Sequence, residues 1–260
     1  RTMIPQDQAS YMDIAPEDHG ENIRRDISFA LVDMGIRPEA SHHEMGPGQN
    51  EIDFRYADPL TAADNASTFK WVVKSIATSD GVWADFSPKP LADKPGNGMH
   101  INMSVESRDG QDHSAAFMAG ILEHIREMTL FLNPIRESYE RLGDMKAPKF
   151  VSWSEQNRSQ LIRIPASRSD LKRFELRSPD PMANPYLAFA LLIYAGLDGI
   201  ERGLEPMAPL DVNLFKADAS ITDQLKRLPQ SLDEAAAYAQ SSEFIRSIIP
   251  EEYFDAYTIL

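Results

Sequence analysis

Two glutamates flank a short glycine-rich turn, and their spacing suits the binding of a divalent cation. Glu44 and Glu51 lie at the ends of the segment EMGPGQNE, whose Gly-Pro-Gly turn lets the chain reverse closely. Carboxylates with an occasional imidazole are the ligands of hard cations such as Mg²⁺ and Mn²⁺. With His100 and Glu175 added, the sequence predicts a cluster that holds divalent ions. The alternative is that these glutamates are solvated and that the histidines before them are ordinary polar residues of a strand end, His42 and His43.

Arginine is concentrated in one short stretch of an acidic chain. A guanidinium group presents a fork of donors to carboxylate or phosphate oxygens, and phosphoryl transfer needs such donors together with metal ions. The stretch contains Arg141, Arg158, Arg163, Arg173 and Arg177. The alternative is a set of surface ion pairs with Glu140, Glu155 and Asp170, and this interpretation is preferred for Arg168.

Charge and composition exclude several classes of function. The 26 basic and 40 acidic residues give a net charge of −14, which opposes binding to nucleic acid or to an anionic membrane. The absence of cysteine excludes disulfides, redox thiols and thiolate metal sites. There is neither a signal peptide nor an apolar run of bilayer length, so a cytoplasmic location is predicted.

Nucleotide-binding loops of the common kinds are missing from the sequence. There is no G-x-x-x-x-G-K-[ST] motif, and Gly96-Asn97-Gly98 is too short for a dinucleotide fingerprint. Any bound nucleotide must therefore be held by metals, arginines and strand edges.

Three short strands are predicted to position these groups, over residues 51–56, 99–105 and 173–177. In each of them polar and apolar residues alternate, so one face is polar and the other packs on a core. The polar faces carry Glu51, Asp53 and Arg55; His100, Asn102 and Ser104; and Arg173, Glu175 and Arg177. One such strand is typical of a half-exposed sheet, but three of them with this content favour a shared site.

Helical patterns alternate with these strands. A stripe of Ile23, Ile27, Ala30, Leu31 and Met34 ends at a C-terminal cap, Gly35. Further helices are expected after Pro59, with Ala62, Ala66, Phe69, Val73 and Ile76 buried, and over 114–132. An apolar and therefore buried helix is expected over 185–200, and short helices follow residue 221. The pattern predicts one α+β domain over residues 1–260, with an antiparallel or mixed sheet that lines an active-site cavity and helices packed on its outer face.

Read in order, the polar segments resemble glutamine synthetase. The matching segments are HHEMGPGQNEIDFRYADPLTAADN, FSPKPLADKPGNGMHINMS, NPIRESYERL, NRSQLIRIP and RFELRSPDPMANPYLAFALLIYAGLDGIE. They occur in the order of the family and cover nearly all of residues 4–201. The resemblance implies a cytoplasmic ligase in which the γ-carboxylate of glutamate attacks ATP and ammonia then displaces phosphate from the γ-glutamyl phosphate.

The resemblance also implies roles for individual residues. Glu44 and Glu51 match ligands of the metal nearer glutamate, and His100 and Glu175 match ligands of the metal that bridges the ATP phosphates. The implied substrate-binding residues are Gly96, His100, Arg141, Arg158 and Arg177, of which Arg158 and Arg177 stabilise the transferred phosphoryl group. The implied nucleotide-binding residues are Tyr56, Asn102, Ser104, Arg163 and Arg173.

The sequence departs from the family pattern at several places. Lys146 stands where members usually carry a glutamate that attracts ammonium, Asn102 replaces a histidine, and Asn213-Leu214-Phe215 lacks a tyrosine that some members modify. The other metal carboxylates and a small β domain, which completes a neighbouring subunit's site in the family's homo-oligomeric ring, would precede Arg1. The chain alone is therefore expected to be an inactive fragment.

Two alternatives to a glutamate–ammonia ligase remain open at this point. Lys146 favours a γ-glutamyl ligase for another amine, and the truncation leaves a non-catalytic structural or binding relative. The ligase assignment depends on one geometric prediction, that six side chains meet in one cavity: Glu44, Glu51, His100, Glu175, Arg158 and Arg177.

Overall fold

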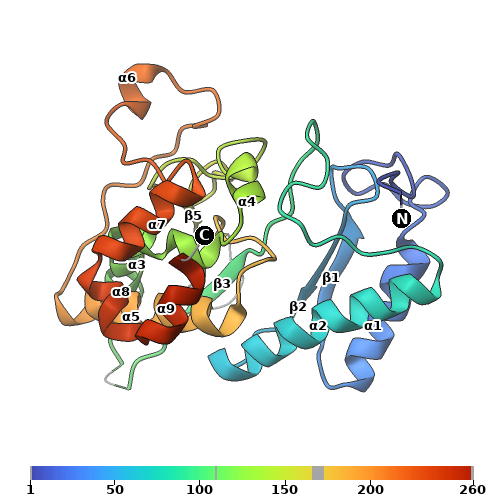
Figure 1. The fold of residues 1–260 in the computed structure, drawn as a ribbon, viewed down its shortest axis with the longest axis horizontal. Helices are drawn as coiled ribbons and strands as arrows, with labels where there is room; N and C mark the ends of the chain where they lie inside the picture. Colours follow the sequence, from blue (N-terminus) through green and yellow to red (C-terminus); the bar gives the residue numbers. More distant parts are fainter. Residues whose placement is uncertain (1, 109, 166–172, 259–260) are drawn as a thin grey trace. The chain divides into compact units, whose positions relative to one another are not determined.

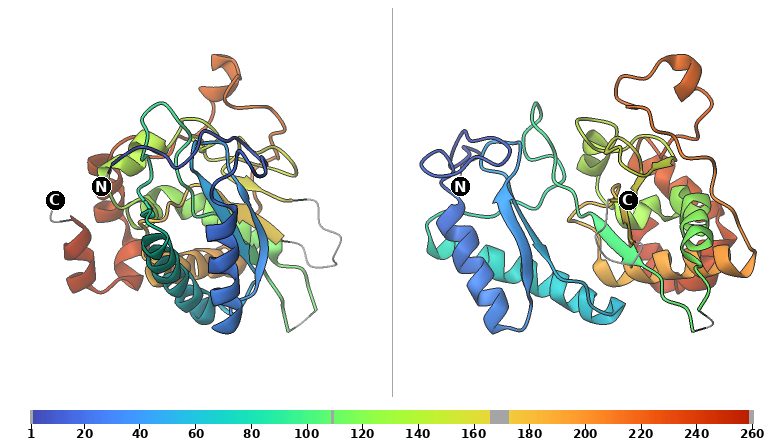
Figure 2. Two further views of the ribbon diagram at one scale, coloured as in Figure 1. Left: turned by 90° about the vertical axis from the view of Figure 1, so that its right-hand side faces the viewer. Right: turned by 180° about the vertical axis from the view of Figure 1, so that it is seen from behind.

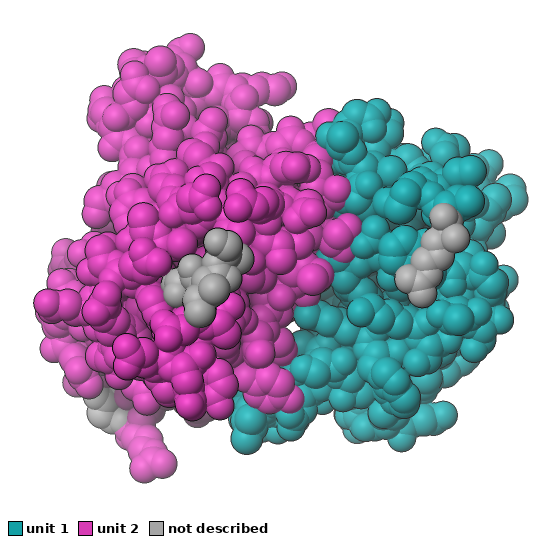
Figure 3. Space-filling view, in the orientation of Figure 1, with its two compact units in different colours: residues 1–86, 90–96 teal, residues 87–89, 97–260 magenta. Residues whose placement is uncertain are grey.

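The computed structural model describes residues 2–108, 110–165 and 173–258. The chain divides into two compact units (Figure 3). Unit 1 comprises residues 1–86 and 90–96, and unit 2 comprises residues 87–89 and 97–260. Among the described residues, no helix has the length and apolar character needed to cross a bilayer. The treatment of residues 1–260 as one catalytic domain stays a prediction.

Unit 1 is a two-stranded antiparallel hairpin packed against two helices (Figure 1). Its elements are α1 (Glu21–Asp33), β1 (Pro38–His43), β2 (Asn50–Phe54) and α2 (Pro59–Ser79). A small core of Ile27, Leu31, Ile36 and Val72 joins the helices to the apolar residues of β2. The hairpin register places His42 opposite Glu51 and His43 opposite Asn50.

Helix α1 ends at the predicted glycine. Gly35 has φ +86°, its N–H donates to the Val32 carbonyl at 2.9 Å, and the Ile36 N–H donates to the Leu31 carbonyl at 2.8 Å. These two bonds form a Schellman motif, which needs a left-handed residue at this position. The C-cap prediction is confirmed. Met34, the last residue of the helical pattern, is the C-cap residue and is 50% exposed.

Helix α2 begins at the predicted proline. The Asp58 side chain accepts a hydrogen bond from the Thr61 N–H at 3.1 Å and caps the helix, while Pro59 occupies its first turn. The predicted stripe is confirmed in part: Ala66 is buried, and Phe69, Val73 and Ile76 are partly buried against the core of unit 1. Ala63 and Val72 are buried, whereas Ala62 and Val73, the predicted members, are only half-buried.

Unit 2 contains a four-stranded mixed sheet in the order β3-β6-β5-β4. The strands are β3 (Ile101–Ser104), β4 (Trp153–Ser154), β5 (Ile162–Arg163) and β6 (Arg173–Leu176); only the β4–β5 pair is parallel. Asn102 lies opposite Glu175, which lies opposite Arg163, so polar residues form one row across three strands. The predicted alternation of faces in β3 and β6 is thereby confirmed.

Helices cover the apolar side of this sheet. The helices of unit 2 are α3 (Ser114–Leu132), α4 (Arg136–Arg141), α5 (Pro185–Glu201), α6 (Ala219–Thr222), α7 (Leu232–Ser241), α8 (Glu243–Ile248) and α9 (Glu251–Thr258). Helices α3, α5, α7 and α8 share one core with Ile101, Phe174 and Leu176 of the sheet. Both views of Figure 2 show α6 extending on a long loop away from the other helices of unit 2. The predicted α+β class, the helix over 114–132 and the short C-terminal helices are confirmed.

Helices α3 and α5 approach each other so closely that glycine is required at their contact. A Cβ atom on Gly120 would lie 2.0 Å from the Ala195 carbonyl oxygen, and one on Gly199 would lie 2.2 Å from the Ala116 carbonyl oxygen. Helix α5 is nevertheless not buried all round, as its apolar sequence predicted. Tyr194 is 53% exposed and Leu197 is 44% exposed, because α3 covers only one side of the helix.

Candidate metal and anion sites

Unit 1 places three potential metal ligands at the end of its hairpin. Nε2 of His42 lies 3.6 Å from Oε1 of Glu44 and 3.8 Å from Oε2 of Glu51. Among the described residues, these three offer ligand atoms that all lie within 4.8 Å of one another. The predicted convergence of Glu44 and Glu51 is present, and His42 belongs to the same cluster. We call these three residues the carboxylate cluster.

His42 is a member that sequence reasoning missed. Adjacent residues of a strand point to opposite faces, so the sequence alone does not tell whether His42 or His43 faces the glutamates. The signal was the pairing of His42 with Glu51 across the hairpin. That pairing follows once the turn length is known, because cross-strand neighbours share a face.

The turn between the strands fixes the spacing of the two glutamates. The Glu44 N–H donates to the Gln49 carbonyl at 2.8 Å, and the Gln49 N–H donates to the Gly46 carbonyl at 2.9 Å. Gly48 adopts φ +63°, a left-handed conformation that glycine enters without steric cost. The Gly-Pro-Gly turn therefore closes as its composition predicted.

The carboxylate cluster carries more negative charge than its surroundings compensate. Burial, together with the neighbouring carboxylates of Asp53 and Glu44, raises the pKa of Glu51 to about 8. Glu51 therefore keeps its proton to a higher pH than an isolated glutamate does. A site in which carboxylates resist ionisation is one in which a divalent cation is strongly favoured, since the cation removes the repulsion.

Unit 2 holds a second cluster, built around one carboxylate and several arginines on the polar row of its sheet. Oε2 of Glu175 accepts hydrogen bonds from Nε of Arg163 at 2.8 Å and from Nη1 of Arg177 at 2.9 Å. Oε1 of the same carboxylate lies 3.5 Å from Nδ1 of His100. Arg163 lies opposite Glu175 in the sheet register, so strand pairing itself produces this contact. We call these four residues, with Arg141, the guanidinium cluster.

The guanidinium cluster keeps its histidine neutral. Desolvation by the surrounding residues and the positive charges of Arg177, Arg141, Arg163 and Arg158 hold the pKa of His100 well below its usual value, although its side chain is 30% exposed. A neutral imidazole is the form that coordinates a metal ion. The chemistry of His100 and Glu175 thus fits the predicted metal ligands, and the surrounding arginines fit an anion.

Arg141 is fixed in this cluster by backbone contacts. Its Nη1 donates to the Ser178 carbonyl at 2.7 Å and its Nη2 to the Arg177 carbonyl at 3.1 Å, and the residue is only 3% exposed. Burial lowers the pKa of Arg141 to about 10, so it stays charged at neutral pH. A Cβ atom on Gly98 would lie 2.7 Å from Nη2 of Arg141 and 2.8 Å from Nε2 of His100. A side chain at position 98 would therefore collide with both nitrogen atoms.

Two buried polar atoms in this region have no hydrogen-bond partner within the described chain. They are Nε of Arg177 and Oγ of Ser178. A buried donor without a partner is costly, and at a binding site it marks a group that a ligand satisfies. Ser178 is a residue that sequence reasoning missed, and its only signal was its position next to Arg177.

The remaining predicted residues have more ordinary surroundings. Arg158 is exposed, but its charge helps to lower the pKa values of His100 and Arg177, so it lies near both. Asn102 and Ser104 are exposed on the polar row of β3, and the exposed Arg173 lies opposite Ser104.

In unit 1, the strand prediction extended too far. β2 ends at Phe54, so Tyr56 lies outside the strand and is 71% exposed, with the Arg55 guanidinium 5.7 Å from its ring centre. The Gly96 carbonyl accepts a hydrogen bond from the Gln49 side chain at 3.1 Å. A surface ion pair was predicted for Arg168, and Asp170 was one of the proposed acidic partners. Both residues lie outside the described residues. Within the described residues, Arg163 and Arg177 both pair with Glu175.

The structure thus forms two clusters, one within each unit. Glu44 and Glu51 come together in unit 1, and His100, Glu175 and Arg177 come together in unit 2. The predicted meeting of all six side chains in one cavity, and the role given to each residue, stay predictions.

Comparison with known proteins identifies a family for the whole chain. A family model described as the catalytic domain of glutamine synthetase matches residues 1–260. Glutamine synthetase from Methanosarcina mazei is 45% identical over 96% of the chain and 60% of its own length. Glutamine synthetase from Thermus thermophilus is 45% identical over 95% of the chain and 59% of its own length. The chain therefore spans about three fifths of the length of these curated relatives.

Solved structures support the same relationship. The structure of a complex of GmaS with ADP matches with a TM-score of 0.88 and 30% identity, over 98% of this chain and 64% of that chain. A cryo-EM structure of Plasmodium falciparum glutamine synthetase matches with a TM-score of 0.84 and 26% identity, over 97% and 60% of the two chains.

Proposed function

This chain belongs to the glutamine synthetase catalytic-domain family, and on that premise we propose that the protein is an ATP-dependent ligase that joins ammonia to the γ-carboxylate of glutamate. The observation that carries the proposal is the guanidinium cluster. Arg163 and Arg177 share one carboxylate, Glu175, while the buried Asp180 lies near Arg141. Nε of the buried Arg177 has no hydrogen-bond partner within the described chain. Such a cluster is suited to bind phosphate and carboxylate groups.

The proposed reaction has two steps. An oxygen of the γ-carboxylate attacks the γ-phosphorus of ATP, the bond to the bridging oxygen breaks, and ADP leaves. The amine then attacks the carbonyl carbon, phosphate leaves with the former carboxylate oxygen, and the amine loses a proton. Charge on the moving phosphoryl group must be stabilised by positioned cations, and we assign this task to Arg158 and Arg177.

Substrate binding is assigned to groups that the structure keeps charged or exposed. Arg141, which is fixed by two carbonyl oxygens, would bind the α-carboxylate of glutamate beside Gly98. The resemblance also assigns the Gly96 backbone to glutamate binding. Arg163 and Arg173 would contact the ATP phosphates. Three exposed side chains would hold the rest of the nucleotide, Tyr56, Asn102 and Ser104. The similarity to the complex of GmaS with ADP supports a nucleotide ligand.

Divalent cations are assigned to both clusters. The raised pKa of Glu51 and the lowered pKa of His100 are the features expected of ligands that coordinate a metal with Glu44 and Glu175, respectively. Mg²⁺ or Mn²⁺, when bound, neutralises phosphate charge and orients the phosphoryl group.

Phosphate release by the full-length protein tests this assignment. Release should require ATP, glutamate and ammonium together. The absence of turnover with all three would remove the proposal. The resemblance further implies a homo-oligomeric ring for the full-length protein, which light scattering after size-exclusion chromatography tests.

Ligation of another amine is favoured by one loop of unit 2. Lys146 is half-buried with φ +60°, a conformation that costs a residue with a side chain about 1–2 kcal/mol. Next to it, Asp144 binds Nζ of Lys89 at 2.5 Å, and the Gly143 N–H donates to the Pro148 carbonyl at 3.2 Å. The loop thus holds a cation where the resemblance places a glutamate that attracts ammonium.

A screen of amine acceptors, with Lys146→Glu as the matched variant, separates the two ligases. If another amine is the substrate, its rate in the unchanged protein exceeds the ammonium rate, and Lys146→Glu shifts the preference toward ammonium. Rates that never exceed the ammonium rate count against this alternative.

A non-catalytic relative is the remaining candidate. Calorimetric titration with Mg²⁺-ATP distinguishes it, because a protein that only keeps the fold would give no heat of binding. The ligase predicts saturable binding that weakens when Arg163, a proposed phosphate contact, is replaced.

A further inference from the structure

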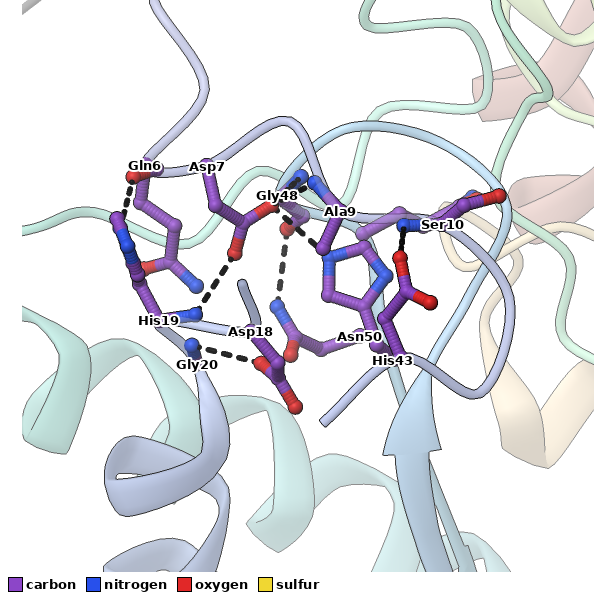
Figure 4. A network of polar contacts seen from close by, with 12 residues as sticks. Gln6, Asp7, Ala9, Ser10, Asp18, His19, Gly20, His43, Gly48 and Asn50 are labelled. Carbon is purple, nitrogen blue, oxygen red and sulfur yellow. Dashed lines mark hydrogen bonds and ion pairs between the residues drawn. The ribbon is translucent and has the colours of Figure 1, made fainter. Parts of the chain in front are cut away.

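The N-terminal segment of unit 1 contains a buried carboxylate that contacts both ends of the metal-ligand turn. Oδ1 of Asp7 accepts hydrogen bonds from Nε2 of His43 at 3.0 Å and from the Gly48 N–H at 2.8 Å. His43 directly precedes Glu44, and Gly48 lies three residues before Glu51. Figure 4 shows Asp7 beside Gly48 and His43, at the point where the chain leaves β1 and returns to β2. One side chain therefore restrains both arms of the turn.

His43 transmits this restraint to Glu44. Its Nδ1 lies 2.6 Å from the Glu44 carbonyl oxygen, and its ring is completely buried. With Nε2 on Asp7 and Nδ1 on Glu44, the ring has no freedom to rotate. The position of Asp7 thus sets the position of the Glu44 backbone.

A second pair of buried charges supports the other end of the turn. Arg24 binds both oxygens of Asp18, at 3.1 and 2.6 Å, and also donates to Oδ1 of Asn50. Nδ2 of Asn50 donates to the Gly48 carbonyl at 2.9 Å, so this pair reaches the same turn. Gly20 allows the close packing, because a Cβ atom there would lie 2.4 Å from Oδ1 of Asn50.

The network is not itself a metal site, although Asp7, Asp18 and His43 lie close enough together to be one. Asp7 also accepts hydrogen bonds from the Ala9 and His19 N–H groups, and Asp18 accepts one from the Gly20 N–H. Two carboxylates are thus matched by Arg24 and His43 and by backbone donors. A cation would have to displace hydrogen-bond partners that these carboxylates already have.

Stability alone gives a weak reason for such a network. Side chains of Asp7 and Asp18 are about 1% exposed, and desolvation of buried ion pairs offsets most of their attraction. The better attested use of buried polar groups is to specify one arrangement of the chain. Here the arrangement specified is that of the turn between Glu44 and Glu51.

We propose that Asp7 is a positioning residue for the carboxylate cluster: through His43 and Gly48 it holds Glu44 and Glu51 at the separation that a divalent cation requires. This inference rests on the proposed metal role of those two glutamates. Partners that orient metal ligands are commonly needed for affinity almost as much as the ligands themselves.

Mn²⁺ binding to the full-length protein tests the inference without relying on activity. Free Mn²⁺ is measured by electron paramagnetic resonance for the unchanged protein, Asp7→Asn, Glu51→Gln and Leu31→Ala. Asp7→Asn keeps the shape but removes the charge, and it is expected to weaken binding about 10- to 100-fold. Leu31→Ala opens a cavity in the core of unit 1 away from the turn, and it is expected to lower the melting temperature without changing the Mn²⁺ affinity.

The control variants separate the outcomes. If Asp7→Asn keeps the Mn²⁺ affinity of the unchanged protein while Glu51→Gln loses a Mn²⁺ site, this inference is overturned and the proposed function stays intact. Unchanged Mn²⁺ binding in Glu51→Gln overturns the metal assignment together with the inference. Equal weakening in Leu31→Ala and Asp7→Asn overturns it as well, since the effect would then be general destabilisation.

A milder variant covers the case in which Asp7→Asn does not fold. Asn50 is exposed, and Asn50→Ala removes only the support of the Gly48 carbonyl and the contact with Arg24. A several-fold weaker Mn²⁺ affinity is expected. An affinity equal to that of the unchanged protein contradicts the inference.

Discussion

The two clusters carry uncompensated charge of opposite sign, negative in the carboxylate cluster and positive in the guanidinium cluster. In unit 1, carboxylates crowd together, and the pKa of Glu51 rises to about 8. In unit 2, arginines outnumber the one carboxylate, Glu175, and the pKa of His100 falls. The first cluster therefore favours a cation, and the arginines of the second favour an anion beside the cation proposed for His100 and Glu175. Each unit keeps an unfavourable charge arrangement that a ligand would relieve, and perturbed groups of this kind cluster at functional sites.

The largest expected effect lies in unit 2, at Arg177. Arg177→Met should lower kcat by about 10²- to 10³-fold, because a positioned donor to the transition state is lost. Steady-state kinetics with ATP, glutamate and ammonium measure the change. Arg202→Gln is the matched control, since Arg202 is an exposed arginine paired with Asp198, and it should keep full activity. If Arg177→Met kept more than a tenth of the kcat of the unchanged protein, the guanidinium cluster would not be the site that stabilises the phosphoryl group.

The next effect belongs to unit 1 and concerns pH. Glu51 must lose its proton when a cation binds, so the Mn²⁺ affinity should rise about tenfold per pH unit up to about pH 8. Titrations between pH 6 and 8 measure this slope. Glu51→Gln should flatten it, and a slope unchanged by that substitution would show that another group carries the proton.

Protein stability should show the same proton linkage without metal. The pKa of Glu51 is higher in the folded chain than in the unfolded chain. The contribution of Glu51 to the free energy of unfolding is therefore greatest below about pH 4.5. That contribution is lost as the pH rises to about 8. Added Mn²⁺ should restore thermal stability most strongly at the alkaline end of this range, and melting curves with and without Mn²⁺ test it.

A smaller effect is expected at Gly98 in unit 2. In Gly98→Ala the new methyl group would meet Arg141 and His100 at less than 3 Å. Overpacking of this kind costs about 1–3 kcal/mol, so KM for glutamate should rise roughly tenfold. The KM for ATP serves as the internal control and should change much less. Equal changes in both constants would show that Arg141 does not act on glutamate.

The smallest expected effect is structural and confined to unit 1. Gly35→Ala places a side chain at φ +86°, with open space around it, and should destabilise the fold by about 1 kcal/mol. Denaturant unfolding measures this loss. The phosphate contacts assigned to Arg163 and Arg173 in unit 2 should be unaffected, so the inhibition constant of inorganic phosphate should be unchanged. A parallel weakening of phosphate binding would contradict the independence of the two clusters.

Local chemistry explains what could be predicted from the sequence. Gly35, Pro59 and the turn at Gly48 were predictable because each position is decided by backbone conformation within a few residues. The alternation of Glu175 with Phe174 and Leu176 was predictable for the same reason. The pairing of Glu175 with Arg163 could not be predicted, because it depends on the register between strands that are distant in the sequence.

Features set by tertiary packing were missed. Tyr194 and Leu197 are apolar yet exposed, since α3 covers one side of α5 only. Asp7 carried no signal at all, because its partners lie 36 and 41 residues further along the chain. A motif search finds the ligands of a site, but the residues that hold them are visible only in the folded chain.

Oxygen transfer from glutamate to phosphate tests the central claim most directly. The full-length protein is supplied with ATP, ammonium and glutamate labelled with ¹⁸O in the γ-carboxylate, and the released phosphate is analysed by mass spectrometry. A ligase that activates the carboxylate by phosphoryl transfer places one labelled oxygen in each phosphate. Phosphate that carries oxygen from water alone would identify simple ATP hydrolysis and contradict the account.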